Sequence, residues 1–492
     1  VLGSAPDRVR VVVITKDVWS LRLSWGLVGT LGGLDRLTVQ PEETNLLGSQ
    51  QSIFGNFVLE PSATTLGLGY IIPRLGASRV AVLASANVVL NRASGSPEGS
   101  SGGLVAGEPL FSGLTPWAWD ARTQWSDVIT RHYVNGSLDT YVDRATGDRV
   151  PYEYHSRQYQ TNFELRRTFG WETKHEITIS ARVADDVYRV GSAGSPGVDP
   201  RALADFDAAA VPVSDTSVGP SIQYETYTKR YVRVIDFETL ALQEDYRLGQ
   251  DILLRAAPSF RALGGSRDVL DLVAAAQYTF ALRDGLFRAA VVSVTDPEPG
   301  RISDASVQPA LHLVTPTVAG IGRIVADGTL LYRWRNYLNE VTFLGGESRL
   351  RGFPTSFFGG SNFVAYTLEL RSRPVEVLTF QAALVAFFDA GDAFTGMGDF
   401  HPVQSVGIGL RALVPWLDRV VFRADLGFQL ERPIDTSTGA PIPPLALLVT
   451  LGQAFGVPTV APVPVLPTEQ YESQDTTAGS PGNPSQQTII AP

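Results

Sequence analysis

The stretch Leu344-Gly345-Gly346-Glu347-Ser348-Arg349-Leu350-Arg351-Gly352-Phe353-Pro354 lies in the last third of the chain. Two adjacent glycines near its start allow the backbone to adopt positive φ angles, and a third glycine separates Arg351 from Phe353. This pattern predicts a shaped loop that presents one guanidinium group. Whether this loop has a functional role depends on the segments on either side of it.

The segments that follow the loop alternate between apolar and polar residues, as strands with one wet face do. In residues 363–373, one face carries Val364, Tyr366, Leu368 and Leu370, and the other carries Thr367, Glu369, Arg371 and Arg373. The next segment places Leu378, Phe380, Leu384 and Phe388 opposite Thr379, Gln381 and Asp389. Two adjacent strands therefore place Glu369 and Asp389 on one polar face, near the loop that carries Arg351.

Composition favours many strands joined by turns. The 492 residues include 47 glycines and 32 prolines, while only 18% of residues are charged, which is fewer than in a typical soluble globular chain. A chain of this length allows two to four soluble domains, but one large closed sheet uses it equally well. We therefore expect one large closed sheet and not several soluble domains.

The strands of a soluble sandwich and of a membrane barrel both alternate between apolar and polar residues, so strand length must decide between the two folds. The alternating segments run to roughly ten to eighteen residues, longer than ordinary globular strands and suited to tilted strands that cross a bilayer. No window of 18 apolar residues occurs, so no transmembrane helix is expected. The sequence predicts an all-β, transmembrane antiparallel barrel, and a direct count gives about twenty strands.

The chain divides into three predicted parts. Residues 1–19 are expected to be the remnant of a preceding periplasmic domain and a linker, with a strand at 8–15 that has no local partner. Residues 20–455 form the barrel, and within it we expect long loops at 91–107 and 191–220, which are rich in Gly, Ser and Pro. Residues 456–492 are rich in Pro, Ser and Thr and are predicted to be disordered.

Charge and residue counts exclude several functions. A net charge of −10 and a pI near 5.1 argue against a nucleic-acid partner, and the absence of cysteine excludes disulfides and thiolate metal sites. The five histidines are scattered without metal spacing. Gly99–Gly103 matches the G-x-S-x-G pattern, but no strand and helix flank it as that motif requires. We expect no catalytic, cofactor or metal site.

Several segments, in this order, resemble the BamA-like outer-membrane assembly proteins, also called bacterial surface antigens. They are residues 43–48, the 344–353 loop, Glu369-Leu370, Phe387-Phe388-Asp389-Ala390-Gly391, residues 405–411, and a terminal strand signal at Gly452–Phe455. The resemblance implies a barrel of sixteen strands, fewer than the direct count, with the surplus near 91–133 and 302–332. It also implies an extracellular loop that folds into the lumen. The implied loop anchor comprises Arg351, Gly352, Phe353, Glu369, Asp389 and Gly391, with Arg351 against the two carboxylates.

The resemblance further implies a function. Such a barrel, in the bacterial outer membrane, assists the insertion of outer-membrane proteins or translocation across that membrane, without enzymatic chemistry. Its partners are outer-membrane lipids, nascent outer-membrane or secreted clients, and periplasmic accessory proteins, which members usually recruit through POTRA domains before the barrel. The mechanism would use a weak seam between first and last strands, and residues 21–29 contain Gly26 and Gly29. A secretion or solute pore and an outer-membrane lipase remain alternatives.

Overall fold

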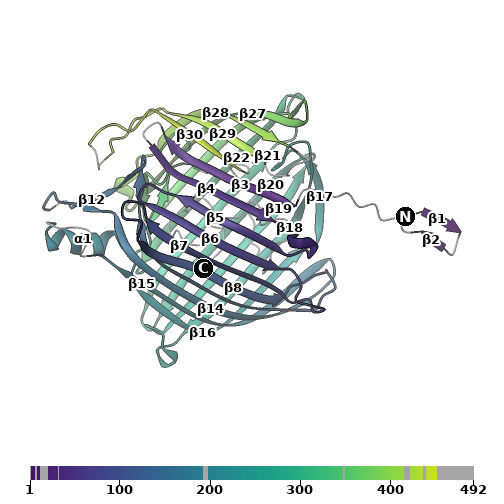
Figure 1. Ribbon diagram of the computed structural model, residues 1–492, viewed down its shortest axis with the longest axis horizontal. Coiled ribbons are helices and arrows are strands. Elements are labelled where there is room, and N and C mark those ends of the chain that lie inside the picture. Colours follow the sequence, from purple (N-terminus) through teal and green to yellow (C-terminus); the bar gives the residue numbers. More distant parts are fainter. Residues whose placement is uncertain are drawn as a thin grey trace.

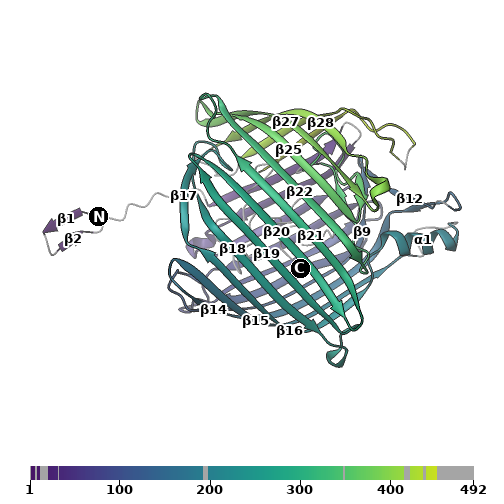
Figure 2. The same cartoon turned by 180° about the vertical axis from the view of Figure 1, so that it is seen from behind.

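The computed structural model describes residues 2–5, 8–10, 20–30, 33–143, 145–191, 198–346, 349–414, 421–435 and 439–451. Its body is one closed antiparallel barrel (Figures 1 and 2). Within these residues the wall has twenty strands. The direct count near twenty is confirmed, and the sixteen implied by the family resemblance is wrong for this chain.

The wall strands follow one another around the barrel in chain order. They are β3 (Leu21–Thr30), β4 (Gly33–Glu43), β5 (Ser52–Leu59), β6 (Ala63–Ile72), β7 (Ala81–Asn91), β8 (Pro97–Glu108), β9 (Trp117–Arg131), β14 (Glu153–Phe169), β15 (Thr173–Arg189), β16 (Asp215–Thr228), β18 (Gln243–Ser259), β19 (Val269–Leu282), β20 (Gly285–Glu298), β21 (Arg301–Val314), β22 (Gly322–Asn336), β25 (Asn362–Ser372), β27 (Phe380–Phe394), β28 (Val403–Leu413), β29 (Phe422–Gln429) and β30 (Leu445–Leu451). Wall strands β8, β9, β21 and β22 occupy the two regions where the direct count exceeded sixteen.

Shorter elements lie in the connections. They are β10 (Tyr133–Val134), β11 (Ser137–Leu138), β12 (Thr140–Val142), β13 (Arg149–Pro151), α1 (Pro200–Ala210), β17 (Arg230–Ile235), β23 (Thr342–Leu344), β24 (Phe358–Gly360) and β26 (Val375–Val377), with short 3₁₀ turns at Leu46–Gly48, Arg261–Leu263 and Met397–Asp399. None of the described helices is long and apolar enough to cross a membrane.

The barrel closes where β3 pairs with β30, with Leu27 opposite Val449 and Thr30 opposite Ala446. This register places Ser20 and Leu451 near the same end of the barrel. Outer-membrane barrels keep short turns on the periplasmic side and long loops outside. Tight turns at 170–172 and 283–284 lie at the end with Ser20, whereas the connections at 132–152, 190–214 and 337–361 lie at the other. We therefore call these the periplasmic and extracellular ends.

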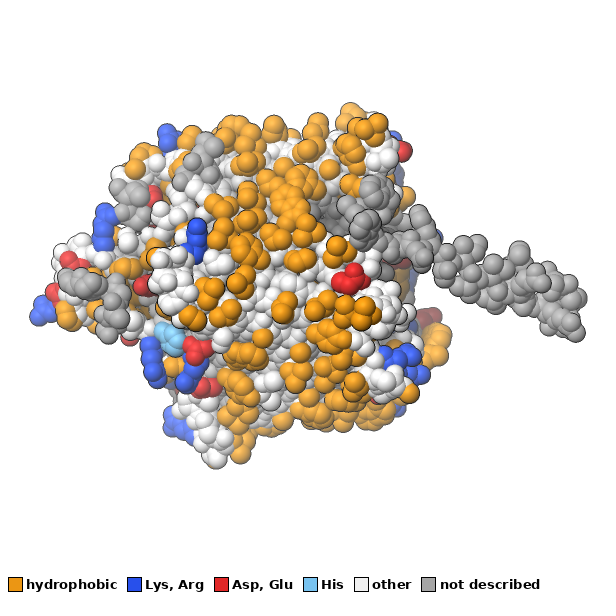
Figure 3. Space-filling model, in the orientation of Figure 1, with side chains coloured by type: hydrophobic (Ala, Val, Ile, Leu, Met, Phe, Trp, Pro, Cys, Tyr) orange, Lys and Arg blue, Asp and Glu red, His pale blue; other side chains and the backbone are white. Residues whose placement is uncertain are grey.

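The two faces of the wall differ as the alternation predicts. On β25, the side chains of Tyr366, Leu368 and Leu370 are exposed on the outside, while Thr367 and Glu369 are buried on the inside. Figure 3 shows hydrophobic side chains spread over the outer wall, with charged side chains gathered toward the ends. An apolar outer face and a polar lumen are what a closed sheet needs in a bilayer, where every backbone group must be paired internally.

The long loop expected at 91–107 is wrong, because most of it is strand β8. Close neighbours on the adjacent strands explain its glycines, and at Gly102 the neighbour is an aromatic ring. A Cβ on Gly102 would lie 2.6 Å from the ring of Trp125, its partner on β9, and 2.4 Å from the carbonyl oxygen of Ser85. Glycine here makes room for a neighbour and does not mark a loop.

The irregular stretch expected at 191–220 is also partly wrong, since it contains α1 and the start of β16. Asp199 caps the helix by accepting a hydrogen bond from the backbone N–H of Arg201, and Pro200 opens it. The apolar side of α1, with Ala202 and Phe206, is buried against the 132–152 connection. The Asp-Pro signal was present in the sequence, but it was hidden among loop-forming residues.

The expected strand at 8–15 has a local partner after all. Its described part, β2 (Arg8–Arg10), pairs with β1 (Leu2–Ala5) in a separate two-stranded sheet. Residues 11–19 and 452–492 lie outside the described residues, and so do Gly452 and Phe455 of the terminal strand signal. The three part boundaries stay predictions.

We expect Gly102→Val to destabilise the barrel by about 1–3 kcal/mol, because the new side chain must displace Trp125 or the strand backbone. Urea unfolding in detergent micelles, followed by tryptophan fluorescence and heat-modifiable gel mobility, measures this. Gly191→Ala is the matched control, since a Cβ there meets no atom within 4 Å. Equal stability of the two variants would refute the packing explanation for the glycines of β8.

Candidate functional site in the barrel lumen

The extracellular connection between β22 and β25 folds into the lumen and carries Arg351, whose side chain is completely buried. The Arg351 guanidinium donates to both oxygens of Asp389, from Nε at 2.8 Å and from Nη2 at 2.7 Å. Its Nη1 donates to Oε1 of Glu369 at 2.5 Å. The Arg351 backbone N–H donates to Asp389 as well, at 3.0 Å. The structure thus brings the loop arginine against both carboxylates that the alternation had placed on the polar face.

Two further groups complete the surroundings of Arg351. Asp425 on β29 lies 3.5 Å from Nη1, and the ring of Phe387 lies flat against the guanidinium, with 3.6 Å between Cζ and the ring centroid. A desolvated cation over an aromatic face is favourable, and so is paired donation to a carboxylate. Strands β25, β27 and β29 each supply one carboxylate, so the arginine ties the loop to three strands.

A second tier of arginines surrounds the same carboxylates. Arg371 Nε donates to Oε2 of Glu369 at 2.6 Å, and Arg411 and Arg423 form ion pairs with Asp425 at 2.5 and 2.8 Å. Buried charges are tolerated when paired in this way, because the mutual attraction offsets the loss of hydration. The cluster is a rigid electrostatic lock with no unoccupied centre for a substrate.

Gly352 and Phe353, which follow Arg351, add hydrogen bonds and apolar packing to the anchor. The Gly352 N–H donates to Ser405 Oγ at 3.3 Å, and its carbonyl accepts from Gln429 Nε2 at 2.8 Å. A Cβ on Gly352 would lie 2.4 Å from that of Ser405, so only glycine allows this approach. Phe353 is fully buried in an apolar cluster with Leu331, Leu344, Leu350, Phe363, Ala365, Ala393, Val403 and Ile442.

Gly391 has a different place from the other predicted anchor residues. It lies in β27 opposite Ala365 and Val403, and a Cβ there would be 2.4 Å from the carbonyl oxygen of Val364. It permits close strand packing beside Asp389, and no described hydrogen bond joins it to Arg351. Gly452 and Phe455 fall outside the described residues.

The sequence analysis placed Arg371 on the polar face beside Glu369, but it assigned no contact to Arg371 and did not foresee Asp425, Phe387, Arg411 or Arg423 around the loop arginine. A signal existed, because Arg423 and Asp425 alternate with apolar residues on β29 and therefore face the lumen. Alternation shows the face, but not how far around the wall one loop side chain reaches. That distance depends on the curvature of the closed sheet.

The outer part of the inward-folded connection is fixed by another extracellular loop. His132, which follows β9, donates from Nε2 to the carbonyl oxygen of Ser356 at 2.7 Å, and its Nδ1 pairs with Asp139 at 3.0 Å. The His132 ring also packs on Phe343, with 4.2 Å between ring centroids. The connection is therefore held at its tip and near its base.

A different element occupies the periplasmic end. The hairpin of β17 and the first half of β18, with the turn 236–242, folds onto the inner wall; Phe237 packs with Leu286, Val314 and Val325. Figures 1 and 2 place β17 at the end of the barrel opposite α1. The sequence predicts one strand over 223–234 and does not predict this hairpin; the structure divides that stretch between β16 and β17.

The wall from β4 to β14 is lined differently. A hydrogen-bonded chain of uncharged side chains crosses it, from Gln40 to Asn56 at 3.3 Å, on to Asn87 at 3.0 Å, and from Asn87 to Ser101 at 3.2 Å. Gln124 and Gln160 pair further around, at 2.9 Å. This part of the wall also carries ion pairs, of Arg122 with Asp120 at 2.8 Å and of Arg166 with Glu164 at 3.8 Å, so the chain of uncharged side chains spans β4 to β8 and charged ones appear on β9 and β14.

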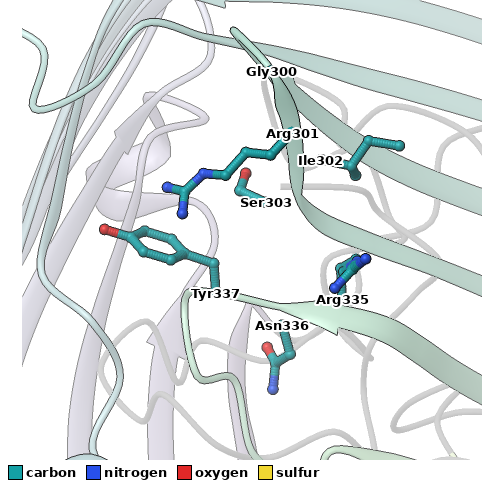
Figure 4. Close-up of a pocket in the computed structure, with 7 residues that line it drawn as sticks. All are labelled: Gly300, Arg301, Ile302, Ser303, Arg335, Asn336 and Tyr337. Carbon is teal, nitrogen blue, oxygen red and sulfur yellow. The ribbon is translucent and has the colours of Figure 1, made fainter.

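One pocket of about 450 Å³ opens between the ends of β21 and β22 and is shown in Figure 4. Its lining includes Arg301, whose guanidinium lies over the ring of Tyr337 with 4.9 Å between Cζ and the centroid and pairs with Glu298 at 2.9 Å. The pocket shares no lining residue with the Arg351 cluster. No group of three or more potential metal ligands occurs among the described residues.

Fold and site together define a transmembrane β-barrel of the bacterial outer-membrane type, with a lumen partly filled by its own extracellular loop. No protein-family model and no curated protein matches the chain. Solved structures do match at low identity. They include BamA from Haemophilus ducreyi lacking POTRA domains 1–3, with 11% identity, 89% of this chain and 71% of that chain covered, and a TM-score of 0.37.

Two other matches broaden the comparison. CdiB from Escherichia coli shows 13% identity, with 89% of this chain and 63% of that chain covered and a TM-score of 0.41. BauA, the ferric preacinetobactin receptor from Acinetobacter baumannii, shows 11% identity, with 88% and 79% covered and a TM-score of 0.41. The match spans less than two thirds of CdiB.

We expect Arg351→Gln to destabilise the barrel by about 3–5 kcal/mol, because Asp389 loses its cation inside a desolvated cluster. Urea unfolding in micelles measures the change. Arg157→Gln is the control; Arg157 is half exposed and lies 3.4 Å from Asp185, so its loss should cost less than about 1 kcal/mol. An Arg351→Gln barrel as stable as the Arg157→Gln barrel would show that the cluster is not an anchor.

Proposed function

We propose that this barrel assists the insertion of outer-membrane proteins, or the translocation of polypeptide across the outer membrane, without enzymatic chemistry. The observation that carries the proposal is the buried contact of Arg351 with Glu369, Asp389 and Asp425, which holds an extracellular loop inside the lumen. A barrel built only for steady diffusion gains nothing from a loop locked across its interior. In a machine that handles proteins, the loop keeps the lumen closed until a client arrives.

The seam supports the same proposal. Among the described residues, four register pairs join β3 to β30, whereas ten join β3 to β4 and seven join β29 to β30. A strand edge with few partners is a template for an incoming strand, which adds by main-chain hydrogen bonds. Gly26 and Gly29 in β3 reduce the side-chain packing that would otherwise stabilise the closed seam.

The anchored loop and the seam act together in the proposed mechanism. The anchored loop keeps β25, β27 and β29 rigid, so strain is concentrated at the seam, next to β29. A client strand then pairs with the edge of β3 or β30 while the rest of the barrel keeps its shape. Every step in this mechanism is an exchange of hydrogen bonds, so no nucleophile or cofactor is needed.

A pore is the second candidate, and the chain of uncharged side chains on β4 to β8 favours it. The chain of Gln40, Asn56, Asn87 and Ser101 offers hydrogen bonds to a passing solute without strong charge. Recordings in planar bilayers separate the two candidates. A large, steady conductance that does not change when the seam is cross-linked would favour the pore.

A lipase needs a serine activated by a histidine. Four of the histidines have other partners: His132 pairs with Asp139, His155 with Asp127, His175 with Tyr224 and His312 with Asp327. A fluorophosphonate probe tests this alternative directly, since labelling of any serine would support an enzyme.

We expect a disulfide across the seam to stop the activity. The pair Val28→Cys and Leu448→Cys faces across β3 and β30, and the chain has no cysteine to interfere. Proteoliposomes that contain the barrel should accelerate the folding of a urea-unfolded eight-stranded outer-membrane barrel, oxidation should abolish the acceleration, and dithiothreitol should restore it. Folding is followed by heat-modifiable gel mobility.

The matched control is the pair Leu165→Cys and Ile179→Cys, which faces across β14 and β15 on the closed wall. Oxidation of this pair should leave the acceleration unchanged. Insertion through the seam is wrong if the oxidised seam variant works as well as the control.

A further inference from the structure

We infer that the turn 236–242 and the hairpin that carries it form a second closure of the lumen, at the periplasmic end, and that Glu369 couples this closure to the extracellular loop. The two closures then open and shut together. The inference concerns contacts inside the barrel and does not depend on which client or solute the barrel serves.

The turn is preformed and firmly seated. Glu244 accepts hydrogen bonds from the backbone N–H groups of Phe237, Glu238 and Thr239, at 2.9 to 3.1 Å, which fixes the shape of the turn before it contacts the wall. Phe237 is then buried against β20, β21 and β22, as described above. Leu240 is buried with Ala383, Leu413 and Val421, so one short turn reaches from β20 to the segment before β29.

Two arginines of the inner wall form contacts that hold the turn in place. Arg371 Nη1 donates to the carbonyl oxygen of Phe237 at 2.9 Å. Arg323 Nη2 donates to the carbonyl oxygen of Ile235 at 3.4 Å, and its guanidinium lies over the Phe237 ring with 5.2 Å between Cζ and the centroid. The two hydrogen bonds are side chain to backbone, so they need the backbone in this position, and the contact of Arg323 with the Phe237 ring adds to them.

Glu369 joins this closure to the loop. One of its oxygens, Oε1, accepts from Arg351 of the extracellular loop, and the other, Oε2, accepts from Arg371, which holds Phe237. The path from the extracellular loop to the periplasmic turn is therefore Arg351, Glu369, Arg371 and Phe237. Glu369 and Arg351 are completely buried, so water does not screen the steps between them.

The closed state leaves one donor of Arg371 unsatisfied, which gives the coupling its direction. Arg371 Nη2 is buried and has no hydrogen-bond partner among the described residues. While Arg351 occupies Oε1 of Glu369, Arg371 has only Oε2. When Arg351 withdraws, Oε1 becomes free and Arg371 can rotate to bind both oxygens, the arrangement that arginine and carboxylate prefer. The second bond is made by Nη2, which lies on the same edge of the guanidinium as Nε. We infer that the resulting shift toward Glu369 lengthens the contact of Nη1 with the carbonyl oxygen of Phe237, so release of the loop loosens the turn.

A bend in β18 allows the turn to move as a unit. Residues 251–256 of β18 pair with β16, whereas residues 243–248 pair with β17. Gly249 lies between them with φ of +90°, a conformation that favours glycine. The hairpin joins the wall at two places, at Lys229 after β16 and at Gly249 in β18, and the second of these is a conformationally permissive residue.

The test uses a single cysteine as a reporter on the full-length barrel, because the native chain has none. In Leu240→Cys the thiol is buried under the periplasmic closure, and a charged methanethiosulfonate reagent should label it slowly. Adding Arg351→Gln, at the other end of the path, should raise the labelling rate about tenfold. Arg233→Cys is the matched control; its side chain lies on the exposed face of the same hairpin and should label at one rate with or without Arg351→Gln.

The role of Arg371 is tested in the same assay. With Arg371→Met the reporter should label fast, and Arg351→Gln should add no further increase, because the path is already cut. A Leu240→Cys rate that does not change with Arg351→Gln, or equal increases from Arg351→Gln with and without Arg371, would overturn the coupling.

If Arg351→Gln does not fold to a heat-modifiable barrel, the reciprocal experiment tests the same coupling from the periplasmic side. Phe237→Ala loosens the periplasmic turn, and Leu350→Cys reports on the loop, where Leu350 is buried beside Arg351. Coupling between two sites is mutual, so Phe237→Ala should speed the labelling of Leu350→Cys by a similar factor. No increase would overturn the inference.

Discussion

A single guanidinium, that of Arg351, must be neutralised in a place that water does not reach. One carboxylate would satisfy its charge, but five donors in a planar fork need acceptors on several sides. Glu369, Asp389 and Asp425 provide them from three wall strands. The loop is consequently fixed in position by the curvature of the barrel as well as by its own sequence, and Gly352 and Phe353 can pack closely only because the arginine holds them there.

The lumen has two unlike halves as a result. From β20 to β29 the inner wall is charged and is covered by the extracellular loop above and the periplasmic hairpin below. From β4 to β8 it carries amides and hydroxyls that bond to one another, and β9 and β14 add the ion pairs of Arg122 with Asp120 and of Arg166 with Glu164. The seam between β3 and β30 lies beside the strand that contributes Asp425, so the anchored part of the wall is close to the junction where, among the described residues, the fewest register pairs join two wall strands. This contrast between a rigid lock and a weak edge underlies the proposed role in protein insertion or translocation.

Much of the fold follows from local pattern. Alternation on β25 and β27 correctly placed Glu369 and Asp389 in the lumen and Tyr366 and Leu368 toward lipid, because the side chains of a strand can point in only two directions. The same reasoning failed at β8, where glycines opposite Trp125 resemble a loop, and at α1, where a capped helix is set among loop-forming residues. In both cases the deciding factor is a neighbour distant in sequence.

The sequence by itself determined the class of fold and the faces of its strands, including the polar face that carries Glu369 and Asp389, since each of these depends on residue spacing along one strand. The pairing of Arg351 with the two carboxylates was an expectation from the family resemblance. Only the tertiary structure decided between the direct count near twenty strands and the sixteen implied by the resemblance, and only it showed Asp425 and Phe387 around Arg351 and the periplasmic hairpin that reaches Arg371. These features depend on how the sheet curves and closes, which brings together side chains more than a hundred residues apart, such as Phe237 and Arg371. No local sequence pattern shows which of these distant side chains will meet.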